Sequence, residues 1–224
     1  MALVGRKIDK GVQETMGRYI GPVCRLCRRE GVKLFLKGTR CNSGKCAIDR
    51  QRGIPGMHKL RRSKASEYAV RLREKQKVKR YYGIFERQFR NYYDEATRRP
   101  GNSGAALLAL IERRLDNVVT RLGFAQSRKQ ARQLITHGHF QVNGRKLDIP
   151  SYLVRPGDTI KVKDREASKK LAEHVLVHES GPAIPSWLDR LGTEPPEGRV
   201  SRLPGSEDLS GEFNAQLIIE LLSR

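Results

Sequence analysis

The fold of the C-terminal half is decided by residues 113–162, RRLDNVVTRLGFAQSRKQARQLITHGHFQVNGRKLDIPSYLVRPGDTIKV. Apolar residues recur at helical spacing from Leu107 to Leu122, just before and within this stretch, and predict one amphipathic helix. Ser127 and Gln130 have the spacing of a capping box, so they predict the start of a second helix.

The residues after Gly138 predict strands. The dipeptide Asn143-Gly144 favours the type I′ turn of a β-hairpin. Residues 152–154 and 160–162 are further short apolar segments that suit strands. We therefore expect a unit of two helices and a small antiparallel sheet.

A long basic helix is predicted before this unit. It begins after Ser66, which suits an N-cap, and Glu67 lies in the first turn, where the helix dipole favours a carboxylate. Gly83 breaks or kinks this helix, so two helices remain an alternative to one. Residues 100–104, PGNSG, are typical of a linker, and we place a domain boundary there.

The composition predicts a polyanionic partner. The 224 residues carry a formal net charge of +21, and the first hundred hold 27 basic against 9 acidic residues. Nucleic acid is the commonest polyanion that such a surface binds. No apolar run approaches the ~18 residues that span a bilayer, which excludes a membrane-spanning protein. Residues 1–13 lack the apolar core of a secretion signal, so we expect a cytoplasmic protein.

Four cysteines have the spacing of a structural zinc site. Cys24 and Cys27 are separated by two residues, and Cys41 and Cys46 follow as a second pair. Two such pairs can place four thiolates around Zn²⁺ with no open position for a catalytic water. Four reduced thiols, two disulfides and an iron–sulfur cluster are the alternatives, and a cytoplasmic setting argues against disulfides. The expected cofactor is a structural zinc ion.

Residues 113–162 resemble the RNA-binding module named after small-subunit ribosomal protein S-four. The resemblance rests on both helices and on the motifs HGHFQVNG and RPGD in this order. The cysteine spacing, the segment REKQKVKRYYGIFERQFRNYY and the terminal QLIIELLSR extend it to nearly the whole chain, in the cysteine-containing form of that ribosomal family.

The resemblance implies a structural component of the small ribosomal subunit and no enzyme. It implies a primary binder of small-subunit ribosomal RNA that organises the 5′ domain during assembly. It also implies neighbouring ribosomal proteins as partners, a place near the mRNA entry and an influence on decoding accuracy, with no small-molecule substrate.

The candidate RNA contacts are basic residues of the long helix region and of the smaller module. Proteins read double-helical RNA through phosphates, 2′-hydroxyls and shape, so cations on a rigid body are the expected contacts. They are Arg61, Arg62, Lys64, Arg71, Lys75, Lys79 and Arg80, with Arg128, Lys129, Arg132, His137, His139, Arg145 and Lys146 on the module. The two histidines suit local caps equally well, and the tyrosines near residues 81 and 92 suit the core better than base stacking.

Two other functions share some of these features. An RNA-modifying enzyme can carry the same module, but the residues after it are loop-rich and show no pattern of a catalytic pocket. A zinc-dependent regulator that binds DNA would attach a recognition helix directly to its metal site, and residues 53–56, GIPG, interrupt that connection.

The expected fold class is α+β. We divide the chain into a zinc-stabilised basic extension (1–60), a helical RNA-binding domain (61–103, completed by 195–224) and the RNA-binding module with its connector (104–194). We expect residues 193–208 to form an extended loop. The apolar stretch from Leu217 to Leu222 is expected to pack back on the helical domain.

Overall fold

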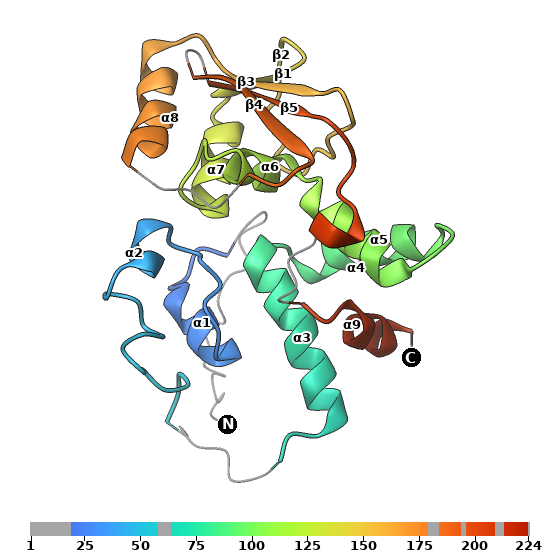
Figure 1. The fold of residues 1–224 in the computed structure, drawn as a ribbon. Helices are drawn as coiled ribbons and strands as arrows, with labels where there is room; N and C mark the ends of the chain where they lie inside the picture. The colour runs from blue at the N-terminus through green and yellow to red at the C-terminus, as the bar shows by residue number, and fades with distance from the viewer. Residues whose placement is uncertain (1–18, 58–63, 179–183, 194–195, 209–212, 224) are drawn as a thin grey trace, which may run out of the picture.

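The computed structural model describes residues 19–57, 64–178, 184–193, 196–208 and 213–223. Two halves lie one above the other (Figure 1). The lower half consists of helices, and the upper half contains an antiparallel sheet with helices packed against it. The class is mixed helix and antiparallel sheet, as the sequence predicts. The helices of the lower half are α1 (Cys24–Glu30), α2 (Thr39–Asn42), α3 (Glu67–Tyr82), α4 (Glu86–Thr97), α5 (Ser103–Glu112) and α9 (Ala215–Leu222).

The basic helix region forms two helices, which decides between the alternatives left open by the sequence. Ser66 caps α3, and its side chain accepts a hydrogen bond from the backbone N–H of Ala69. Gly83 ends the helix in the left-handed conformation at φ +66°, which a residue with a Cβ adopts only with strain. α4 then begins three residues later and turns back beside α5.

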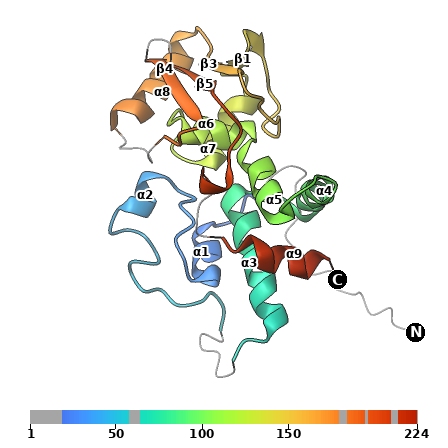
Figure 2. The same ribbon diagram turned by 45° about the vertical axis from the view of Figure 1, so that its right-hand side comes forward.

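The core of the lower half joins residues from distant parts of the sequence. Leu34 and Val78 are fully buried in it, together with Phe89 of α4 and Ile111 of α5. Ile218 of α9 is also fully buried in this core, and α9 lies along α3 and α5 (Figure 2). α5 follows the PGNSG linker, yet its apolar side chains belong to this core, and the change to the second core comes after residue 112.

The upper half holds the sheet and the remaining helices. In the described residues the sheet has the strand order β2-β1-β3-β5-β4, and every neighbouring pair is antiparallel. The elements are α6 (Leu115–Arg121), α7 (Arg128–Thr136), β1 (Phe140–Val142), β2 (Arg145–Lys146), β3 (Thr159–Val162), α8 (Glu166–His178), β4 (Leu188–Thr193), β5 (Pro196–Val200) and the 3-10 helix η1 (Ser206–Asp208).

The hairpin between β1 and β2 turns at Asn143-Gly144 as predicted. Both residues have positive φ, at +51° and +76°, which is what a type I′ turn requires. The carboxylate of Asp158 accepts hydrogen bonds from Asn143 Nδ2 and from the backbone N–H of Arg155, so the RPGD motif holds the hairpin against β3.

Three predictions about the upper half are wrong. Residues 107–122 form two helices because Arg114 leaves the helical path and pairs with Leu153 in an isolated bridge. That bridge is also the only strand pairing in residues 152–154. Residues 196–200 are no extended loop, since β4 and β5 add two strands to the sheet. Gly198 of β5 packs closely on Leu122, and a Cβ at position 198 would lie 2.7 Å from the methyl groups of Leu122.

Candidate nucleic-acid interface

A buried junction joins the two halves and fixes the relative orientation of the surface cations that each half carries. We call Tyr82, Glu112, Asn117 and Arg121 the junction network. The Glu112 carboxylate is buried and accepts hydrogen bonds from the Tyr82 hydroxyl at 2.6 Å, from Arg121 at 2.8 Å and from Asn117 Nδ2. Burial alone would raise the pKa of Glu112, but the charge and hydrogen bond of Arg121 outweigh it and hold that pKa below its usual value.

A second buried contact joins the halves on the α4 side. The Arg114 side chain is fully buried and forms a bidentate pair with Asp116, at 2.7 Å and 3.1 Å. It also donates to the Tyr92 hydroxyl on α4 at 2.9 Å. Planar, charge-assisted pairs of this kind hold one geometry, so the two halves meet at a defined angle.

The cations of the module gather around α7 and the hairpin. Lys129, His137, Arg145 and Lys146 are exposed. The Lys146 side chain packs across Gly138, where a Cβ would lie 2.6 Å from Lys146 Cε, and this contact brings β2 against the end of α7. His137 and His139 are neighbours there, with ring centroids 6.3 Å apart.

Unlike these exposed residues, His139 is half-buried. Its Nδ1 lies 2.9 Å from the Ser168 hydroxyl of α8. Burial, followed by the charges of His137, Arg165 and Lys163, lowers the pKa of His139 below its usual value. A neutral ring at physiological pH can offer RNA a hydrogen bond but no positive charge.

Arg128 and Arg132 reach back to α3. The Arg128 guanidinium lies 3.8 Å from the ring centroid of Tyr81 and donates to the side-chain oxygen of Asn117 at 2.8 Å. Arg132 donates to the Gly83 carbonyl, at the negative end of the α3 dipole. These two arginines therefore have structural contacts in addition to any RNA contact.

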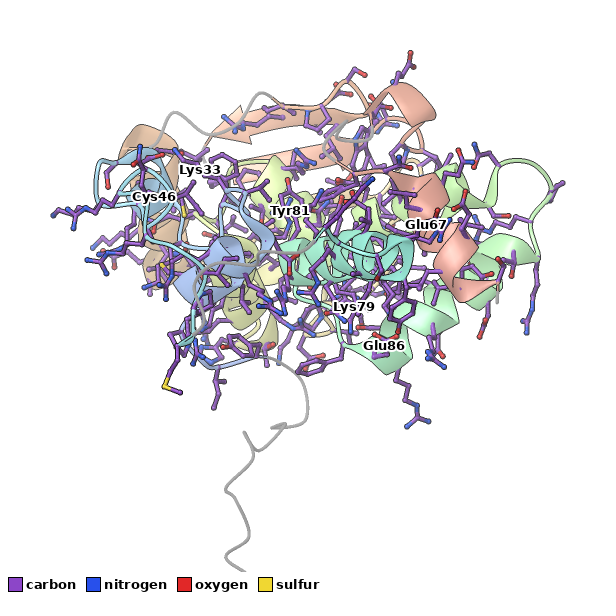
Figure 3. The ribbon with its side chains drawn as sticks, turned by 90° about the horizontal axis from the view of Figure 1, so that it is seen from below. Lys33, Cys46, Glu67, Lys79, Tyr81 and Glu86 are labelled. Atoms are coloured by element: carbon purple, nitrogen blue, oxygen red, sulfur yellow. The ribbon has the colours of Figure 1, made fainter. Side chains whose placement is uncertain are left out.

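The predicted contacts on α3 are engaged by carboxylates. Arg71 pairs with Glu67 and Glu220, and Lys75 and Lys79 share Glu86. Figure 3 shows Lys79 and Glu86 facing each other below α3.

Glu86 is strongly perturbed by this pair. Partial burial opposes ionisation, but the hydrogen bonds and charges of Lys75 and Lys79 lower the pKa of Glu86 to about 2.

Arg80, the last of the predicted contacts on α3, pairs with α1. Arg80 and Arg73 both contact Glu30, whose side chain is almost fully buried. Lys64 is exposed, and Arg61 and Arg62 lie outside the described residues. The predicted contacts on the long helix are thus partly neutralised within the chain.

The four cysteines lie in one region but do not form a closed metal site. All four are free thiols, and Cys27, Cys41 and Cys46 are buried. Among the residues that the structure describes, no three ligand side chains are grouped closely enough to hold a metal ion. The zinc-clipped extension is therefore not part of the fold described above.

The thiols nevertheless influence one another. Burial raises the pKa of Cys27, and the charges of the other three cysteines raise it further. The backbone N–H of Lys37 donates to Cys41 Sγ at 3.4 Å, and a backbone hydrogen bond from Leu34 lowers the pKa of Cys27. Backbone donors directed at sulfur also stabilise a thiolate, which is the form that binds metal.

Sequence reasoning missed a set of surface cations around the cysteines. Residues 19–57 expose a group of basic side chains on short helices and loops, and Figure 3 shows Lys33 beside Cys46 in this region. Arg25 and Arg52 of this group line a polar hollow together with the half-buried Arg28 and residues 53–56. The signal was the charge count of the first hundred residues, but the candidate RNA contacts were chosen only from the long helix region and the module. The exposed members are Arg25, Arg29, Lys37, Arg40, Lys45, Arg50 and Arg52.

The arrangement suits binding to a large, structured polyanion. Exposed cations occur in residues 19–57, on α7 and on the hairpin, and the buried junction fixes these regions relative to each other. Tyr81, Tyr82 and Tyr92 are buried in the lower core, as expected from their spacing. Within the described residues, no helix has the length and apolar character needed to cross a membrane.

Comparison with known proteins agrees with this geometry. Residues 18–112 match the family model described as ribosomal protein S4/S9 N-terminal domain, and residues 113–160 match the S4 domain. The boundary between the two matches falls where the structure passes from the lower core to the upper core.

Full-length relatives are similar over almost the entire chain. Small ribosomal subunit protein uS4 of Thermus thermophilus is 56% identical over 210 residues, which are 93% of this chain and 100% of the relative. The proteins of the same name from Thermoanaerobacter sp. and Desulfitobacterium hafniense are 53% and 54% identical, again over 93% of this chain and 100% of each relative.

Proposed function

Because this chain belongs to the uS4 family of small ribosomal subunit proteins, we propose that it is a structural component of the small ribosomal subunit and binds the RNA of that subunit. The observation that carries the proposal is the set of exposed cations on two halves that a buried junction holds at one angle. A rigid body with cations on several faces can fix the mutual orientation of RNA helices at a junction. The site of action is the ribosome in the cytoplasm.

The predicted RNA contacts that the structure describes divide into three groups by what they contact. Lys64, Lys129, Arg145 and Lys146 are exposed, and in the described part of the chain they form no ion pair within 4 Å. We assign them to direct phosphate contacts. Of the cations on α3, Lys75 and Lys79 share one carboxylate, so this pair keeps one net positive charge for RNA.

Arg128 and Arg132 of α7, with His137 and His139 just after this helix, form an intermediate group. Their intramolecular contacts set side-chain orientation, and we propose that RNA meets them in that orientation. Pre-set donors lose less conformational entropy on binding than free surface side chains.

The finer role follows from the family resemblance. We propose that the chain binds the 5′ domain of the RNA early in assembly, contacts neighbouring ribosomal proteins and lies near the mRNA entry, where it influences decoding accuracy. We expect no enzymatic activity and no small-molecule substrate.

Footprinting of small-subunit RNA with the purified protein tests the proposal. We expect protection at a junction of several RNA helices, and an affinity whose log K falls by about 0.7–0.9 for each phosphate that the protein neutralises as log salt rises. Equal affinity for duplex DNA at the same salt, or an affinity independent of salt, would contradict it.

We further propose that Cys24, Cys27, Cys41 and Cys46 bind a structural zinc ion. The donor set fits zinc: four thiols in one region, two of them accepting backbone hydrogen bonds. Cys24 and Cys27 of α1, with Cys41 of α2 and the following Cys46, would hold the ion, and a bound zinc would link α1 to the α2 segment. Thiolates are the ligand form, so raised thiol pKa values predict weaker zinc retention as the pH falls.

Elemental analysis of protein purified without chelators tests this proposal. We expect one zinc per chain, a loss of thermal stability after chelation, and loss of zinc in Cys46→Ser. Ser43→Ala, in the same segment, is the matched control and should keep its zinc. Metal-free protein with an unchanged melting temperature after chelation would contradict the zinc site.

A further inference from the structure

A cavity of about 370 Å³ lies where the two halves meet. Its walls come from α1 and the following loop, from the end of α3, and from α6 and α7. The volume lies at the lower end of the range for small-ligand sites, so the cavity suits one compact, planar group.

The walls of this cavity combine aromatic faces with a basic rim. Tyr19, Phe35 and Phe85 line it, and none of the three is buried. Lys129 and Arg132 of α7 line the same cavity. An aromatic lining with cations at the edge is complementary to a nucleotide, whose base is flat and apolar on its faces and whose phosphate is anionic.

Two features of the lining favour stacking. The Arg128 guanidinium lies over Tyr81 at 3.8 Å from its ring centroid, and this arginine also lines the cavity. Guanidinium planes are platforms on which unpaired RNA bases stack.

The second feature is Phe35, which is 40% exposed and has a φ of +48°. A bulky residue in the left-handed region is strained, and such strain is concentrated at binding sites. Phe35 thus presents an aromatic ring to the cavity from a strained backbone, and this ring is not among the residues of the lower core.

We propose that this cavity takes one unpaired base of the bound RNA, stacked between the aromatic lining and Arg128, with the adjoining phosphate on Lys129. The inference rests on the proposed RNA-binding function and adds to it a contact with an unpaired base. Charge complementarity favours a nucleotide over an apolar side chain of a neighbouring protein, because such a side chain would bring no counter-charge to Lys129.

Ultraviolet crosslinking of the full chain to a small-subunit RNA transcript, followed by mass spectrometry of the adducts, tests the base pocket. We expect nucleotide adducts on Tyr19, Phe35 or Phe85. Phe35→Ala should weaken RNA binding by about tenfold, the usual effect of losing one base–aromatic stack. Tyr68→Ala is the matched control, since Tyr68 is an exposed aromatic residue on α3 outside the cavity, and it should change affinity less than about twofold.

Gln76→Trp is a second variant that keeps the test independent of Phe35. Gln76 lines the cavity from α3 and is half-buried, so tryptophan fills the space without a change in charge. We expect loss of the cavity adducts with an unchanged melting temperature.

RNA binding at full affinity with adducts only outside the cavity would overturn the base pocket and leave the proposed function intact. Crosslinks from the cavity to a neighbouring ribosomal protein in assembled subunits would also overturn it. Absence of RNA binding would overturn the proposed function itself.

Discussion

Helices α3 and α7 carry half of the predicted RNA contacts, and their cations have different surroundings. On α3, the carboxylates of Glu30, Glu86 and Glu220 pair with the basic side chains. On α7 and the adjoining hairpin, Lys129 and Lys146 stay exposed. A basic helix face is therefore a weaker predictor of an RNA contact where the rest of the fold supplies carboxylates to it.

The largest expected effect concerns a cation that lies entirely inside the fold. Arg114→Ala leaves the Asp116 carboxylate buried without its partner, which typically costs about 3–5 kcal/mol in the free energy of unfolding. Urea unfolding measures it. Arg99→Ala removes an exposed pair with Glu95 and should cost less than about 0.5 kcal/mol. Equal costs for the two variants would remove the distinction between internal and surface cations.

A smaller loss in the free energy of unfolding is expected for a variant on α3. Lys75 is buried and contacts Glu86 at 2.7 Å, while Glu86 is partly exposed and keeps Lys79 as a partner. Lys75→Gln should therefore cost about 1–2 kcal/mol of stability, between the surface and buried limits. Lys129→Gln is the matched variant on α7 and should stay within about 0.5 kcal/mol. A greater loss in Lys129→Gln than in Lys75→Gln would reverse the comparison.

The order of these variants should be reversed for RNA binding, with larger effects at Lys129 than at Lys75. Lys129→Gln and Lys146→Gln each remove one exposed charge, so each should reduce the slope of log K against log salt by about 0.7–0.9. Lys75→Gln should change this slope less, because that ammonium is buried against a carboxylate. Filter binding between about 50 and about 200 mM salt measures the slopes. The assignment of phosphate contacts fails if all three variants give the same slope.

The smallest expected effect is on how the stability of the fold depends on pH. The pKa of Glu86 is lowered from 4.5 to about 2 in the folded chain, so the carboxylate stabilises the fold fully above about pH 4.5. This stabilisation is lost as the pH falls from there toward 2. Melting temperatures at about pH 5 and about pH 3 should differ less in Glu86→Gln than in the unchanged chain. An identical acid response in both proteins would show that the lysine pair does not stabilise the fold.

Local sequence signals predicted local structure well. The Ser66 cap, the Asn143-Gly144 turn and the strand at residues 160–162 all depend on neighbours within a few residues, and all three are found. At α7, Ser127 accepts from Gln130 N–H, while the Gln130 side chain reaches the backbone N–H of Gln126 and not that of Ser127. The predicted N-cap residue, Ser127, was therefore correct, but only one of the two hydrogen bonds of a capping box is formed.

These local signals could not predict contacts between residues that are far apart in the sequence. Arg71 and Glu220 are 149 residues apart, and Arg80 and Glu30 are 50 apart, so no spacing rule connects them. β4 and β5 were missed because Pro196 and Gly198 are typical of turns. The strand forms because Gly198 allows close packing on Leu122, and this contact exists only in the folded chain.

The path of the chain sets an order of events during synthesis. Residues 113–200 close their own core, whereas the core of the lower half includes Phe213 and Ile218. Its final side chains thus leave the synthesising ribosome well after the whole upper half has emerged. The half that is translated first is therefore completed last, and until then a nascent chain exposes the apolar faces of α3 and α5 to chaperones.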